Sequence, residues 1–113
     1  MQNNTEHISK NALYTKSLQT HNMATELKAL YRQYPTLREL YNSGQYVHAV
    51  VQCNQMEDKL DALELYKMQD VTRQDLCRKL RKAMLSKLES IRHRSQTQLR
   101  ATNQIKLNKI EYK

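Results

Sequence analysis

The chain has 113 residues and a formal net charge of +8, with one Gly, one Pro, no Trp and no Phe. This length suits a single domain (residues 1–113), and so few turn-forming and bulky aromatic residues exclude a β-sandwich and favour helices. The mean hydropathy of −0.88 indicates a thin core, and the positive charge indicates an acidic or anionic partner.

The first third of the chain is expected to be helical after a polar start. Residues 1–7 are polar, and we expect them to be disordered. Apolar side chains at spacings of three and four then predict a helix over residues 8–34. Pro35 lacks the amide proton of an interior helical residue, so we expect a break or strong kink there, followed by a short helix over residues 36–43.

Gly44 stands where a helix C-terminus needs a left-handed residue, which predicts a stop and a new helix over residues 45–68. A connection of three or four residues leads to Thr72, which we expect to cap a last helix over residues 72–112. Such a short link is typical of antiparallel neighbours. The sequence therefore predicts an all-α fold, an antiparallel helical hairpin or small bundle with a long C-terminal helix.

The last predicted helix carries an apolar seam. Its positions recur every seven residues at Cys77, Met84, Ile91, Gln98, Ile105 and Tyr112, and Leu80, Leu88 and Leu99 lie on or beside it. At about 1.5 Å per residue this helix would be about 60 Å long. The preceding residues are too few to cover it, so we expect part of it to be bare, folded back or covered by a partner.

Charge is divided unevenly along the chain. Residues 1–72 carry 7 Lys and Arg against 8 Asp and Glu, whereas residues 73–113 carry 12 against 3. The cationic residues that we expect to form a basic patch are Arg78, Lys79, Arg81, Lys82, Arg92 and Arg94. An exposed, solvated helix face and the binding of an anionic partner are both consistent with this pattern.

The sequence offers no catalytic constellation. Its four histidines, His7, His21, His48 and His93, are far apart, and Cys53 and Cys77 belong to no CxxC pair. We therefore expect a non-enzymatic protein without metal or cofactor, whose cysteines are buried thiols. No run of about 20 apolar residues is present and the N-terminus does not resemble a signal peptide, so we expect a cytoplasmic protein with no membrane insertion.

Residues 36–113 resemble the flagellar export chaperones of the FliT type. The resemblance rests on a helix that ends in a Gly-aromatic turn (Gly44, Tyr46), a following apolar helix with an acidic end (Met56, Leu60, Leu63, Glu64), and a long final helix that closes in an amphipathic segment from Leu99 to Tyr112. Pro35 and the strong positive charge of the last helix depart from the pattern. The resemblance implies a small cytosolic helical bundle that holds a filament-cap subunit before export.

From this resemblance and from the seam we expect a chaperone or adaptor that binds an export substrate, or the export apparatus, through an apolar helical groove. The expected contacts are Leu80, Met84, Leu88, Ile91, Leu99 and Ile105. Each of them is equally consistent with ordinary core packing. The alternatives are a small basic regulator that binds nucleic acid and a coiled-coil assembly subunit, which would form a homodimer or a larger oligomer.

Overall fold

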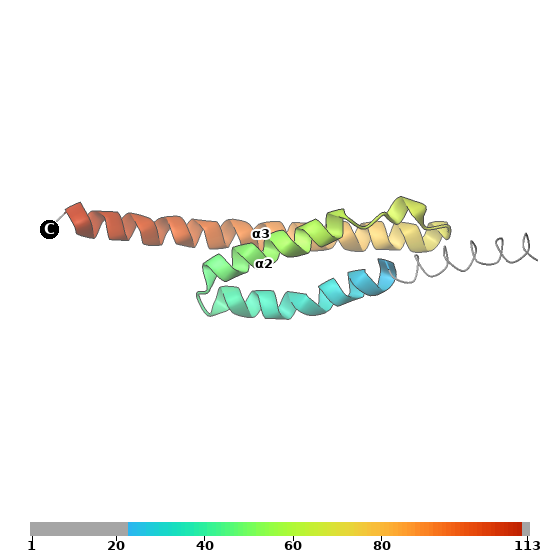
Figure 1. Ribbon diagram of the computed structural model, residues 1–113, viewed down its shortest axis with the longest axis horizontal. Coiled ribbons are helices and arrows are strands. Elements are labelled where there is room, and N and C mark those ends of the chain that lie inside the picture. Colours follow the sequence, from blue (N-terminus) through green and yellow to red (C-terminus); the bar gives the residue numbers. More distant parts are fainter. Residues whose placement is uncertain (1–22, 112–113) are drawn as a thin grey trace, which may run out of the picture.

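The structure is a computed structural model that describes residues 23–111 and, for side chains, residues 23–103. The described part is all-α, as predicted, with no strand (Figure 1). A first helix covers residues 23–42, followed by α2 (Tyr46–Asp61), a short 3₁₀ helix η1 (Leu65–Lys67) and the long α3 (Val71–Glu111). The predicted disordered residues 1–7 and the start of the predicted helix 8–34 lie outside the described residues.

The expected break at Pro35 is wrong, because the first helix continues through this residue. A proline inside a helix removes the hydrogen bond to the carbonyl four residues earlier, here Tyr31, and costs about 3 kcal/mol. Burial on both sides of Pro35 offsets this cost: Leu30 before it is 2% exposed and Leu37 after it is fully buried. The two predicted helices, 8–34 and 36–43, are therefore one helix where the structure describes them.

Gly44 ends the first helix, as predicted. Its φ of 79° is left-handed, and the amides of Gly44 and Gln45 donate to the carbonyls of Tyr41 (3.1 Å) and Leu40 (2.9 Å). This pair of bonds is a Schellman motif, which satisfies carbonyls that the helix end would leave unpaired.

The predicted helix 45–68 is too long, since α2 ends at Asp61. The connection to α3 therefore spans residues 62–70. In this connection Leu63, Leu65 and Met68 are at most 5% exposed. In a continued helix Leu65 and Met68 would lie about 60° apart around the axis and Leu63 would lie on the opposite side, whereas the irregular backbone lets all three enter one core.

The cap of α3 also differs from the prediction. Asp70, not Thr72, caps the helix: its carboxylate accepts a hydrogen bond from the amide of Arg73 at 3.1 Å. A carboxylate at this position also favours the positive end of the helix dipole. The connection is tied to α3 by Gln74 and Arg81, which donate to the carbonyls of Leu65 and Leu63, each at 3.0 Å.

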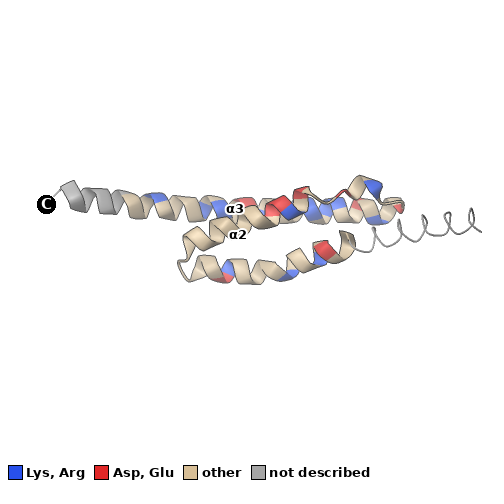
Figure 2. Cartoon of the chain, in the orientation of Figure 1, with Lys and Arg blue, Asp and Glu red and all other residues tan. Residues whose placement is uncertain are grey.

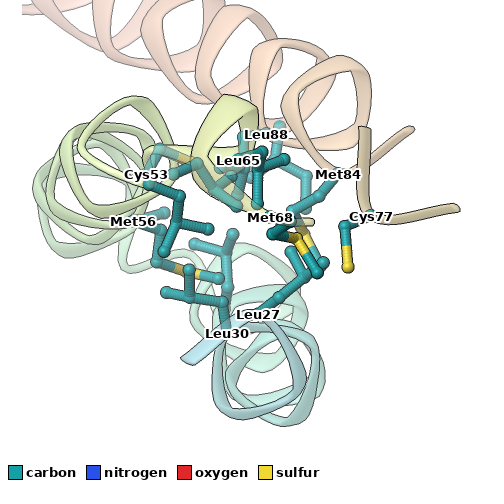
Figure 3. Close-up of a cluster of buried hydrophobic side chains, with 14 residues drawn as sticks. Leu27, Leu30, Cys53, Met56, Leu65, Met68, Cys77, Met84 and Leu88 are labelled. Carbon is teal, nitrogen blue, oxygen red and sulfur yellow. The ribbon is translucent and has the colours of Figure 1, made fainter. Parts of the chain in front are cut away.

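The core lies between the three long helical segments (Figure 3). α2 is antiparallel to α3, and the first helix runs parallel to α3, since Tyr31 contacts Leu80 and Tyr34 lies next to Lys87. The buried apolar side chains come from all of these elements: Leu27, Leu30, Leu37, Ala49, Cys53, Met56, Leu60, Leu63, Leu65, Met68, Cys77, Met84, Leu88 and Ile91.

α3 extends beyond the turn that joins the first helix to α2 (Figure 1). It is continuous to Glu111, so it does not fold back on the body up to that residue. The expectation that part of this helix is bare or covered by a partner is wrong for the seam between Cys77 and Ile91, which the first helix, α2 and the connection bury.

Candidate functional site

One face of α3, next to the buried seam, stays open to solvent along the first helix. Its positions follow spacings of three, four and seven residues, which keep them on one side of the helix: Arg73, Leu76, Leu80, Lys87, Ser90 and Arg94. A matching stripe on the first helix consists of Ala24, Lys28, Tyr31, Arg38 and Asn42. These two stripes line two clefts between the same pair of helices. We call the two clefts together the outer groove.

The apolar end of the outer groove is a cleft of about 540 Å³ between residues 24–32 and residues 73–80. Leu76 is 55% exposed and Leu80 is 36% exposed, while the thiol-bearing Cys77 at 5% forms part of the lining. Exposed leucines are costly to leave in water unless something covers them, at about 25 cal/mol per Å² of apolar surface. This end is therefore suited to binding an apolar side chain or helix face.

Tyr31 fixes the separation of the two helices at this end. Its hydroxyl donates to the carbonyl of Leu80 at 2.8 Å, and burial raises the pKa of the phenol. Because this bond joins the first helix to the backbone of α3, the cleft between them is held open at a defined width.

Cations stand around the apolar end. Lys28, Arg32 and Arg73 line the cleft, no acidic residue of the described part does, and none of the three forms an ion pair with another described residue. Acidic side chains lie mostly elsewhere, many of them towards the end of α2 (Figure 2). The potential around the exposed leucines is therefore positive, which favours a partner with acidic flanks.

The basic end of the outer groove is a second cleft, of about 290 Å³. Three cations line it, Arg38 from the first helix and Lys87 and Arg94 from α3. The ammonium of Lys87 lies 5.2 Å from the centroid of the Tyr34 ring, which is within the range of a cation–π contact. The remaining lining is Tyr41, Asn42, Ser90 and Ile91.

The structure divides the predicted partner contacts. Met84 and Leu88 are fully buried and Ile91 is 7% exposed, so these three belong to the core of the chain itself. The prediction that they form an open receptor surface is wrong in this conformation, and the ordinary-core alternative holds for them. Leu80 lines the outer groove, Leu99 is half-buried, and the side chain of Ile105 lies outside the described residues.

The predicted basic patch is not one surface. Arg92 is only 19% exposed and pairs with Glu57 on α2 and with Glu89, and it also donates to Asn54 at 3.2 Å. Arg81 donates a hydrogen bond to the carbonyl of Leu63 in the connection. The remaining four members have separate surroundings: Lys79 pairs with Asp75 at 3.2 Å, Arg78 and Lys82 are exposed, and Arg94 lies in the basic end of the outer groove.

The cysteines are free and buried, as their spacing predicted. Burial raises the pKa of the Cys53 thiol to about 11, and the nearby Arg92 only partly opposes this. Cys53 is therefore protonated at neutral pH and unsuited to nucleophilic chemistry. Within the described residues no three His, Cys, Asp or Glu side chains are grouped as metal ligands, and no helix there has the length and apolar character needed to span a bilayer.

Sequence reasoning missed most of the outer groove. Leu76, Lys87 and Arg38 were not singled out, although the spacing of Arg73, Leu76, Leu80 and Lys87 is as regular as that of the seam beside it. The helical spacing of this second stripe could have been recognised in the sequence. The stripe is also consistent with a solvated face, because the sequence does not show which helix packs next to it.

Comparison with protein-family models, with curated proteins and with solved structures finds no match for this chain.

Proposed function

We propose that this protein is a non-enzymatic chaperone or adaptor that binds an amphipathic helix of another protein in the apolar end of the outer groove. The observation that carries the proposal is the pair Leu76 and Leu80, which remain exposed beside Cys77 in a cleft of about 540 Å³. A helix with apolar side chains at spacings of three and four presents the surface that such a cleft accepts.

The partner helix carries acidic residues beside its apolar face. Lys28, Arg32 and Arg73 surround the exposed leucines, and the lining from the described residues includes no acidic side chain. Positive side chains at the edge of a binding surface speed encounter with an acidic partner and add little affinity each. The exposed leucines supply most of the affinity, and the cations determine which partner is preferred.

The narrower part of the proposal concerns the biological role. The pattern of residues 36–113 resembles flagellar export chaperones, which supports an export substrate such as the filament-cap subunit as the partner, and a cytoplasmic site of action. The arrangement of a short hairpin with a long last helix is compatible with that role. The contact surface differs from the one expected from the seam, because the outer groove replaces the buried Met84 and Leu88.

The general proposal is tested with a labelled amphipathic peptide that has Leu at helical spacings of three and four and Glu on its flanks. Binding is measured by fluorescence anisotropy for the wild type, for Leu76→Asp and for Val51→Asp. Val51 is a matched control, since it is 48% exposed on α2 and does not line the groove. We expect Leu76→Asp to weaken binding at least tenfold, by the loss of one large apolar contact, and Val51→Asp to leave binding unchanged.

Cys77 gives an independent readout of the same site. Bound peptide should slow alkylation of Cys77, which lines the apolar end, and leave the slow alkylation of the fully buried Cys53 as it was. Equal losses of binding in the two Asp variants, or no protection of Cys77, would show that the groove is not the binding site.

The export role is tested with the filament-cap subunit of the same genome. Co-expression should give a stable complex by light scattering, and Leu76→Asp should prevent it. If the protein binds the peptide but not the cap subunit, the proposed adaptor function stands and the cap subunit is excluded as its substrate.

A further inference from the structure

The basic end of the outer groove holds two arginines that have no polar partner among the described residues. Arg38 and Arg94 form no ion pair and no side-chain hydrogen bond with another described residue. This contrasts with Arg81 and Arg92, which join α3 to the connection and to α2. Together with Lys87, the two arginines place three positive groups in one cleft of about 290 Å³, and no acidic residue within the described ranges lines it.

The aromatic rings in this cleft are already engaged. Tyr34 is covered by Lys87 at 5.2 Å, and Tyr41 packs edge-to-face with Tyr46, with ring centroids 5.6 Å apart. Single-stranded nucleic acid is bound through exposed rings on which bases stack. Since neither ring is left as such a platform, the cleft fits carboxylates better than nucleotides.

The basic end continues the apolar end along the same two helices. On α3 the stripe runs from Arg73 and Leu76 to Ser90 and Arg94, a length of about 30 Å at 1.5 Å per residue. One polypeptide segment of about 20 residues in helical form spans that distance. Both exposed leucines lie at one end of this length, together with cations, whereas the other end has cations without an exposed leucine.

We infer that the outer groove recognises a partner segment in which an apolar helical stretch with acidic flanks is extended, at one end only, by a further cluster of acidic residues. This inference rests on the proposed function and adds the order of the two features in the partner. The apolar stretch occupies the cleft at Leu76 and Leu80, and the acidic cluster reaches Arg38, Lys87 and Arg94. The groove thereby selects a segment of uneven charge over one that is merely amphipathic.

The test uses two peptides of identical composition. Both contain an apolar helical stretch with Glu on its flanks. In the first, the further Glu residues form a block at one end of that stretch; in the second, the same Glu residues are divided evenly between its two ends. Both are titrated into the full-length protein, with a single-stranded oligonucleotide as a third probe. The variants are Arg38→Gln with Arg94→Gln, and a control pair, Arg78→Gln with Lys82→Gln. The control removes the same charge from residues of α3 that line neither cleft.

We expect the block peptide to bind the wild type about tenfold more tightly than the even peptide, because several ion pairs form at once. The Arg38/Arg94 pair of changes should remove this preference, and the control pair should retain it. Circular dichroism should show that both double variants stay folded, since none of the four side chains has a described intramolecular partner.

Three results would overturn the inference. If both peptides bind equally and Leu76→Asp still abolishes binding, the inference about the acidic cluster is wrong but the proposed function stands. If neither peptide binds, both the inference and the proposed function are wrong. Tight, salt-sensitive binding of the oligonucleotide that is lost with the Arg38/Arg94 changes assigns the basic end to nucleic acid instead.

Discussion

Replacing Leu88 with Ala tests whether the seam of α3 is the core of this chain or a surface kept for a partner. Leu88 is fully buried, whereas Leu76 on the same helix is 55% exposed. Truncating a fully buried leucine loses its transfer free energy and leaves a cavity, which together cost about 3 kcal/mol. For Leu76→Ala the expected loss is below about 1 kcal/mol, because half of the residue is already in water and no cavity forms.

The assay is thermal or urea unfolding of the isolated protein, followed by circular dichroism. In a domain of this size each kcal/mol lowers Tm by about 4–8 °C, so we expect a decrease of about 12–24 °C for Leu88→Ala and of less than about 8 °C for Leu76→Ala. Both changes replace Leu with Ala inside one helix, so helix propensity is matched. An unchanged Tm for Leu88→Ala, or similar losses for both variants, would refute the assignment of the seam to the core.

Three further predictions concern the ion pairs, the turn and the buried thiol. Arg92→Met should lower the free energy of unfolding by about 1–2 kcal/mol because it breaks a partly buried pair between helices, whereas Lys79→Met, in an exposed pair, should change it by less than about 0.5 kcal/mol in urea titrations. Gly44→Ala should cost about 1 kcal/mol in the same assay, because its φ of 79° strains any residue with a Cβ, although no atom lies within 4 Å of that Cβ. Folding raises the pKa of Cys53 from 9.0 to about 11, so its contribution to stability is complete below pH 9 and is lost as the pH rises towards 11. Urea midpoints from pH 8 to 11 should fall, and they should fall less steeply for Cys53→Ala.

Local chemistry explains the features that were predictable. The end of the first helix at Gly44 follows from the left-handed conformation that glycine adopts without strain. The long α3 follows from 41 residues, Val71–Glu111, without a glycine or proline to interrupt them. Composition likewise determined the helical class. None of these features depends on what lies next to the segment in space.

Features that depend on burial were predicted less well. Pro35 breaks helices through a local cost, but Leu30 and Leu37 on either side of it are buried, and this burial keeps the helix continuous. The connection after Asp61 carries apolar side chains that looked like one more helical turn. Its real path is set by a core to which Leu63, Leu65 and Met68 all contribute.

The sequence by itself determined that α3 bears two adjacent stripes at helical spacing, one from Cys77 through Met84 to Ile91 and one from Arg73 through Leu76 to Arg94. Only the tertiary structure decided which stripe is buried and which lines the outer groove. The reason is physical: helical periodicity is a property of one segment, whereas burial is a property of the neighbours that cover it. The first helix and α2 cover the first stripe, and the second remains open beside them.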